Sequence, residues 1–130
     1  MTDSILIDED QSGGDDPLAV LMAAALLVEH PDGQKTLRLT RPLPLRFRTK
    51  GGEEREEVLE ELTFRRATGA DLREVGKLAD GNALGASLTL TGRLTGKPER
   101  VIDQLDGEDA SNAAVVANSF FGARPRTGKS

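Results

Sequence analysis

The spacing of hydrophobic residues changes once along the chain, close to Ala67 and Thr68. Before this point, Leu62 and Phe64 alternate with polar residues, as in a β-strand that buries one face. After it, apolar residues recur every three or four positions, which is typical of amphipathic helices. The sequence therefore predicts extended chain followed by short helices.

The extended part is predicted to be a β-hairpin over 35–66, with Gly51-Gly52 in its turn. The loop is too long to fix the register: pairing Leu43 with Leu62 sets Glu60 opposite Leu45, and a two-residue slip sets it opposite Phe47. A two-stranded hairpin is marginal alone, so the helices must cover its apolar face. The residues expected on that face are Leu37, Leu39, Leu43, Leu45, Phe47, Val58, Leu62 and Phe64.

Four short helices are predicted over 69–80, 83–95, from Pro98 to about 105, and 106–121. Two pairs of polar residues at a spacing of three mark helix starts: Thr68 with Asp71, and Asp106 with Asp109. The expected inward residues are Leu72, Val75, Leu78 and Ala79, then Leu84, Leu88 and Leu94, then Val101, Ile102 and Leu105, then Ala110, Ala113, Ala114, Ala117 and Phe121.

An additional apolar helix is predicted over 17–30, with Asp16 as N-cap and Pro31 as its stop. Its apolar run, 18–28, is shorter than the roughly 20 residues that cross a bilayer. The acidic residues before it disfavour a secretory signal. A helix that is apolar on every side must be buried in the core, in an oligomer or against a partner, and all three stay open.

The two ends are predicted to be disordered, as an acidic segment over 1–16 and a basic tail over 123–130. Part of the acidic segment matches a calcium-binding loop. The last position of such a loop needs a bidentate glutamate, however, and it falls on Ala19. A solvated acidic segment is the better interpretation. The matching residues are Asp8, Asp10, Ser12, Gly13 and Asp16.

Composition and charge narrow the function. The formal net charge of −5 argues against nucleic-acid binding, and the absence of cysteine removes disulfides and thiolate metal sites. The one histidine, His30, has no triad or metal-ligand spacing around it. We therefore expect an α+β domain that is not an enzyme and that uses no cofactor or metal.

The order of segments over about 35–122 resembles the tail assembly chaperones of Mu-like and P2-like contractile-tailed phages and their prophage relatives. The extension over 1–34 and Lys97 before Pro98 depart from that pattern. The resemblance is carried by Leu37-Arg38-Leu39-Thr40-Arg41-Pro42, Leu62-Thr63-Phe64-Arg65-Arg66-Ala67-Thr68-Gly69-Ala70-Asp71-Leu72, Leu94-Thr95-Gly96, Val101-Ile102-Asp103-Gln104-Leu105-Asp106, Asp109-Ala110 and Phe120-Phe121-Gly122.

This resemblance implies a protein that binds the tape measure protein in the host cytoplasm, keeps it soluble, and is absent from the mature virion. It also implies a frameshifted longer form in many relatives. Self-association into a homo-oligomer stays open. Two alternatives also remain, a small structural or adaptor protein of the tail and a stand-alone interaction module.

Three apolar residues of the helical half are candidates for partner binding. If Phe121 and Ala117 face the core, Val116 and Phe120 lie toward another side of the same helix. Leu90 is likewise off the expected inward stripe of its helix. The alternative, that all three are core residues, is equally compatible with the pattern.

Overall fold

The computed structural model describes residues 16–78 and 83–121 of the 130-residue chain. These residues form an α+β fold with a three-stranded antiparallel sheet, which confirms the predicted class. In chain order the elements are α1 (Pro17–Ala23), β2 (Leu27–Glu29), β3 (Lys35–Arg48), β4 (Glu54–Phe64), α2 (Gly69–Gly76), α3 (Ala83–Thr95), α4 (Glu99–Asp103), α5 (Gly107–Asn118) and the 3-10 turn η3 (Ser119–Phe121).

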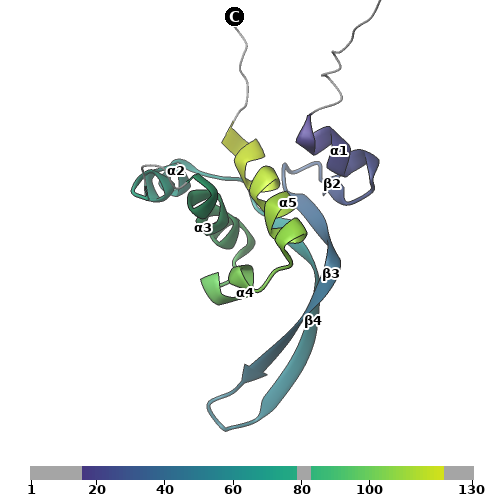
Figure 1. The fold of residues 1–130 in the computed structure, drawn as a ribbon. Helices are drawn as coiled ribbons and strands as arrows, with labels where there is room; N and C mark the ends of the chain where they lie inside the picture. Colours follow the sequence, from purple (N-terminus) through teal and green to yellow (C-terminus); the bar gives the residue numbers. More distant parts are fainter. Residues whose placement is uncertain (1–15, 79–82, 122–130) are drawn as a thin grey trace, which may run out of the picture.

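The sheet has the order β2-β3-β4, and α5 packs on β3 while α3 packs on β4. Only the end of the β3–β4 pair that holds the beginning of β3 and the end of β4 lies against these helices (Figure 1). The far part of the pair, residues 43–59, extends past them and is named the hairpin arm below. The fold therefore has a packed base and a projecting two-stranded arm.

The N-terminal helix is shorter than the sequence predicts. It begins at Pro17 with Asp16 as N-cap, but it ends at Ala23 instead of reaching residue 30. Ala25 then adopts a φ of 63°, which turns the chain back. The rest of the predicted helix forms β2, which pairs with 35–37 of β3. Because of this reversal, Leu21 of α1 and Leu27 of β2 both reach the core.

The register of β3 and β4 differs from both predicted alternatives. Leu37 pairs with Leu62 near the base, whereas Leu43 pairs with Leu59 in the arm, with a bulge between them. The bulge changes which residues of β4 share a face with β3. Leu59 is half-buried, and Val58, expected to face inward, is 57% exposed. Glu60 therefore never faces the apolar side chains of the arm.

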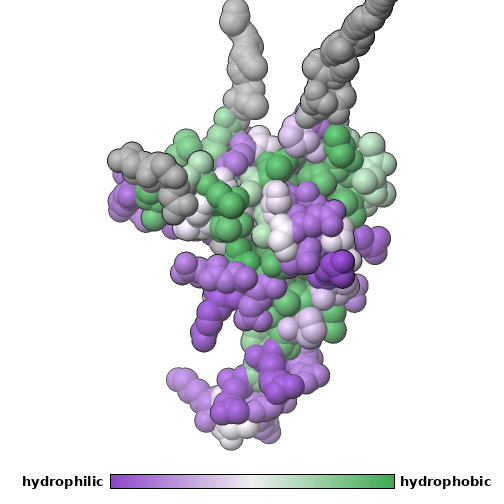
Figure 2. Space-filling model, viewed as in Figure 1, coloured by the Kyte–Doolittle hydropathy of each residue, from purple (hydrophilic) through white to green (hydrophobic). Residues whose placement is uncertain are grey.

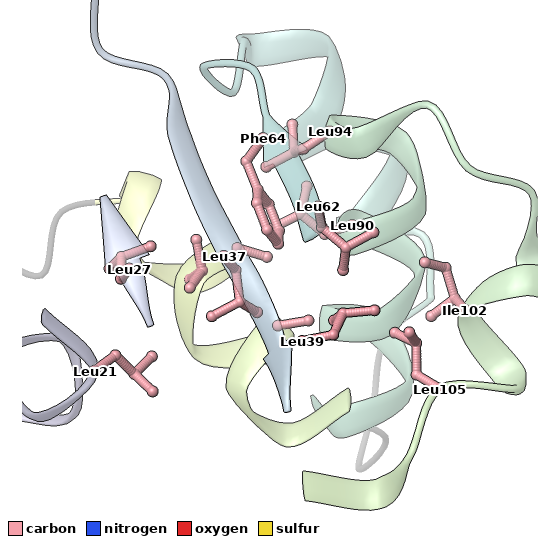
Figure 3. Close-up of a cluster of buried hydrophobic side chains, with 13 residues drawn as sticks. Leu21, Leu27, Leu37, Leu39, Leu62, Phe64, Leu90, Leu94, Ile102 and Leu105 are labelled. Atoms are coloured by element: carbon pink, nitrogen blue, oxygen red, sulfur yellow. The ribbon is translucent and has the colours of Figure 1, made fainter. Parts of the chain in front are cut away.

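The core lies between the base of the sheet and the helices (Figure 3). Leu37, Leu62 and Phe64 of the sheet are fully buried, as predicted, and α4 contributes Ile102. The core consists of Leu21, Leu27, Leu37, Leu39, Leu62, Phe64, Leu90, Leu94, Ile102, Leu105, Ala113, Val116 and Ala117.

The inward faces of α2 and α3 differ from the predicted ones. Leu72 and Leu78 are exposed, as is Leu84 at the start of α3, and Ala79 lies outside the described residues. On α3 the buried residues are Ser87, Leu90, Thr91 and Leu94. Small polar side chains line this face because they make hydrogen bonds there. The Thr91 hydroxyl donates to the Ser87 carbonyl at 2.8 Å, and Ser87 bonds Asn118 of α5.

The predictions for the two ends concern mostly 1–15 and 122–130, which lie outside the described residues. The same holds for most of the calcium-loop pattern. Asp16 is described, and its carboxylate accepts a hydrogen bond from the Leu18 N–H at 3.0 Å. It therefore serves as the helix cap of α1.

Candidate partner-binding groove

The two faces of the hairpin arm differ: the inner face carries the apolar side chains of β3, and the outer face carries ion pairs between the strands. Leu45 and Phe47 of β3 are half-buried on the inner face. On the outer face, Arg46 pairs with Glu56 at 3.1 Å and Arg48 pairs with Glu54 at 2.7 Å. Exposed ion pairs of this kind contribute only about 0–1 kcal/mol each to the free energy of unfolding, so they add little to the stability of the arm. The apolar residues of the inner face are Leu43, Leu45, Phe47 and Leu59, and Glu57 and Arg55 of β4, opposite Leu45 and Phe47, share that face.

The arm length explains why this inner face is only partly covered. The 14 residues of β3 span about 46 Å at about 3.3 Å per residue. The 12 residues of α5 span only about 18 Å at about 1.5 Å per residue. Helices of this size cannot reach the far end of the strand, so its apolar side chains lack a full cover.

Across from the inner face lies α4, and the two enclose a groove of about 620 Å³. Leu45, Phe47 and Val101 give it apolar walls, and Arg100 gives it a cationic edge. Figure 2 shows apolar surface continuing from the helices onto the arm, whose tip is hydrophilic. Residues of β3 that alternate with the inner apolar ones also border the groove, so its full lining is Pro44, Leu45, Arg46, Phe47, Arg48, Pro98, Arg100, Val101 and Gln104.

An ion pair supports the aromatic ring in this groove. The Arg55 guanidinium lies 4.9 Å from the centroid of the Phe47 ring and 3.0 Å from a carboxylate oxygen of Glu57. Arg55 is directly opposite Phe47 in the register. A cation over an aromatic face is attractive, so this contact restrains the ring where the arm has no third strand.

At the other end of the sheet, a buried carboxylate joins β4, α2 and α3. The side chain of Asp71 is 1% exposed and receives both terminal nitrogens of Arg65, at 2.8 and 3.0 Å, and Nε of Arg93 at 3.0 Å. It also forms a capping box with Thr68 at the start of α2. The Arg65 hydrogen bonds, followed by those of Thr68 and Arg93, hold the pKa of Asp71 well below its usual range despite burial.

The two residues of the second predicted cap pair, Asp106 and Asp109, make different contacts. Asp106 is the N-cap of α5 and accepts from the Glu108 N–H at 3.0 Å. Asp109 is fully buried and bonds β3 instead. It accepts from the N–H and hydroxyl of Thr40 at 2.8 and 2.9 Å and from the Arg41 N–H at 3.0 Å. It therefore ties α5 to the bulge at the foot of the arm.

The structure places the three candidate partner-binding residues at the packed base and not along the groove. Leu90 and Val116 are fully buried in the core. Leu90 is buried because α3 turns a face different from the predicted one inward, and Val116 joins Ala113, Ala114 and Ala117, which are buried on α5 as predicted. Phe120 is half-buried: its ring lies 6.5 Å from that of Phe64, and Lys35 Nζ lies 4.5 Å above it. None of the three lines the groove.

Further apolar side chains are exposed outside the groove. Leu72 and Leu78 of the α2 region and Leu84 of α3 form one set, and the others belong to α1 and β2. A smaller groove of about 360 Å³ lies between α3 and α4. The exposed residues of α1 and β2 are Val20, Met22 and Val28.

Across 16–78 and 83–121, no helix combines the length and hydrophobicity that crossing a membrane requires. Within the same ranges, no cluster of three or more histidine, cysteine or acidic side chains has the arrangement of a metal site.

The described residues thus form a small α+β domain with a groove beneath a projecting hairpin arm. The chain belongs to the family described as "Phage tail assembly chaperone proteins, E, or 41 or 14", whose profile matches residues 36–122, about two thirds of the sequence. This family indicates a non-enzymatic role in tail assembly. No curated protein and no solved structure matches the chain significantly. The matched region begins at the second residue of β3, so α1, β2 and every other residue before β3 lie outside it.

Proposed function

We propose that this chaperone binds the tape measure protein of a Mu-like or P2-like contractile-tailed phage and keeps it soluble during tail assembly. The family supplies the role in assembly, and the groove beneath the hairpin arm supplies a surface for a client. The observation that carries the proposal is the inner face of the arm, where Leu45 and Phe47 are only half-buried. The packed base leaves these side chains available to a partner.

The groove suits an amphipathic helix. Such a helix would lay its apolar side against Phe47, Leu45 and Val101, while Arg100 at the edge would favour acidic residues on its flank. Each contact is small, so a single site would bind weakly. Many chaperone copies along one long client would still cover it, because each copy shields one apolar stretch.

The chaperone acts in the cytoplasm of the host and leaves before the particle is complete. Mass spectrometry of purified mature tails tests this directly. We expect the protein to be absent or far below the tape measure protein in amount. A stoichiometric amount would instead favour the alternative, a structural or adaptor protein of the tail.

A charge placed in the groove should abolish the solubilising activity. In co-expression with the tape measure protein, wild-type chain should keep the client soluble, whereas Phe47→Asp should let it precipitate. The reason is that aspartate removes the ring that the client would contact and puts a charged group, together with Arg55 opposite it, where an apolar side chain has to bind. The measurement is the fraction of tape measure protein in the soluble extract and in a pull-down.

The matched control is Val58→Asp, on the outer face of the same arm, where the side chain is 57% exposed. This variant should retain the client like wild type. Equal loss in both variants would show that the arm, but not its inner face, matters. Failure of wild-type chain to retain the client would overturn the proposed function.

A further inference from the structure

The hairpin arm begins at an unusually large irregularity of the sheet. Between the pairs Arg38–Glu61 and Leu43–Leu59, β3 has four residues where β4 has only Glu60. Extra residues in one strand bend that strand and change its twist. The direction of the arm is therefore decided within residues 39–42.

Bending at this place frees backbone N–H groups that a regular ladder would use. Pro42 has no N–H, but those of Thr40 and Arg41 need acceptors. The two oxygens of Asp109 supply them, Oδ1 to Thr40 at 2.8 Å and Oδ2 to Arg41 at 3.0 Å. Oδ1 also accepts from the Thr40 hydroxyl at 2.9 Å. The Asp109 carboxylate thus accepts the hydrogen bonds that backbone carbonyl groups of a neighbouring strand would otherwise accept.

The start of α5 makes a second contact with the same segment. Asp106, the N-cap of α5, has Oδ1 at 3.3 Å from Nε of Arg41. Both aspartates lie at the N-terminal end of the helix, where the helix dipole favours negative charge. The first turn of α5 is therefore fixed to both the backbone and a side chain of the bulge.

We propose that Asp109 is a positioning residue that sets the direction of the hairpin arm relative to α4, and with it the width of the groove. An aspartate is required because both of its oxygens accept hydrogen bonds, whereas an asparagine would turn its amide NH2, a donor, toward one of the N–H donors. The consequence for client binding rests on the proposed function. The effect on arm direction does not.

A distance measurement in the full chain tests this inference. The chain has no cysteine, so Lys50→Cys at the arm tip and Asp103→Cys in α4, both exposed sites, accept spin labels at those two positions alone. Pulsed electron paramagnetic resonance then gives the distribution of label distances. Asp109→Asn should shift and broaden this distribution while thermal unfolding stays cooperative.

The matched control is Glu108→Gln, which makes the same change of charge one residue away on an exposed part of the same helical turn. It should keep the wild-type distribution. If Asp109→Asn also keeps it, the inference is wrong. A variant that merely loses stability would move the melting temperature without changing the distances in the folded state.

If Asp109→Asn does not fold, Thr40→Val decides the question, because it removes only the hydroxyl donor. A smaller broadening supports the inference, and a wild-type distribution contradicts it. Retention of the tape measure protein is measured separately. Lost retention with an altered arm supports the link to function, whereas failure of wild-type chain to bind rejects the proposed function and leaves the distance result standing.

Discussion

Replacing Phe64 with alanine should lower the free energy of unfolding by about 3–5 kcal/mol. The side chain is fully buried, next to Leu62 and Leu94 in the core (Figure 3), and its ring stacks on that of Phe120. Alanine would leave a cavity where β4, α3 and the end of the last helix meet. Urea denaturation should show a lower midpoint with an unchanged slope.

Phe47→Ala is the control for this effect. Phe47 is half-buried in the arm and is not part of the core cluster, so its removal should cost less than about 1 kcal/mol. A change below about 1 kcal/mol for Phe64→Ala would contradict the packing described for the base.

Asp71→Ala should lower the free energy of unfolding by about 3 kcal/mol at neutral pH. The change leaves the guanidinium groups of Arg65 and Arg93 without their shared carboxylate and opens the capping box of α2. This loss is at the lower end of the range for breaking a buried ion pair, because the side chains of Arg65 and Arg93 keep access to water, at 45% and 35% exposure.

The same variant has a defined pH dependence. Because the pKa of Asp71 is lowered on folding, its carboxylate contributes its full stabilisation above the unfolded-state pKa of about 3.9. That contribution is lost as the pH falls from there toward the folded-state pKa. The difference in stability between wild type and Asp71→Ala should therefore be constant near neutrality and shrink below about pH 4. An equal difference at both ends of this range would contradict the role of the ionised carboxylate.

Local patterns in the sequence predict much of the base of the fold. The change of period at Ala67 and Thr68 coincides with the end of β4 and the start of α2. The helix predicted over 83–95 coincides with α3. Such features depend on neighbours in the chain, because hydrophobic period and capping are local properties.

The N-terminal segment shows where local reasoning fails. An apolar run over 18–28 is compatible with a helix, but the structure divides it so that Leu21 and Leu27 enter one core. The sequence His30-Pro31-Asp32-Gly33-Gln34 holds the missed signal. A Pro-Asp-Gly run favours a turn between strands, and here His30 and Gln34 bond across it at 2.8 Å.

The groove was beyond prediction for a different reason. The bulge at the foot of the arm is held by hydrogen bonds from Thr40 to Asp109, 69 residues away, and no spacing in the sequence encodes that contact. Asp109 at a spacing of three from Asp106 looks like a second capping residue. For Leu90 and Val116 the sequence left a partner-facing and a core position equally open, and the structure places both in the core, because the rotation of a helix is settled by the neighbour it packs on.

The most direct measurement is site-specific photo-crosslinking in cells that co-express the chaperone and the tape measure protein. A photoreactive amino acid is placed at position 45, in the groove, or at position 58, on the outer face of the same arm. The account predicts a crosslink to the tape measure protein from position 45 and little or none from position 58. Crosslinking from position 58 alone, or from neither position while the client stays soluble, would contradict binding in the groove.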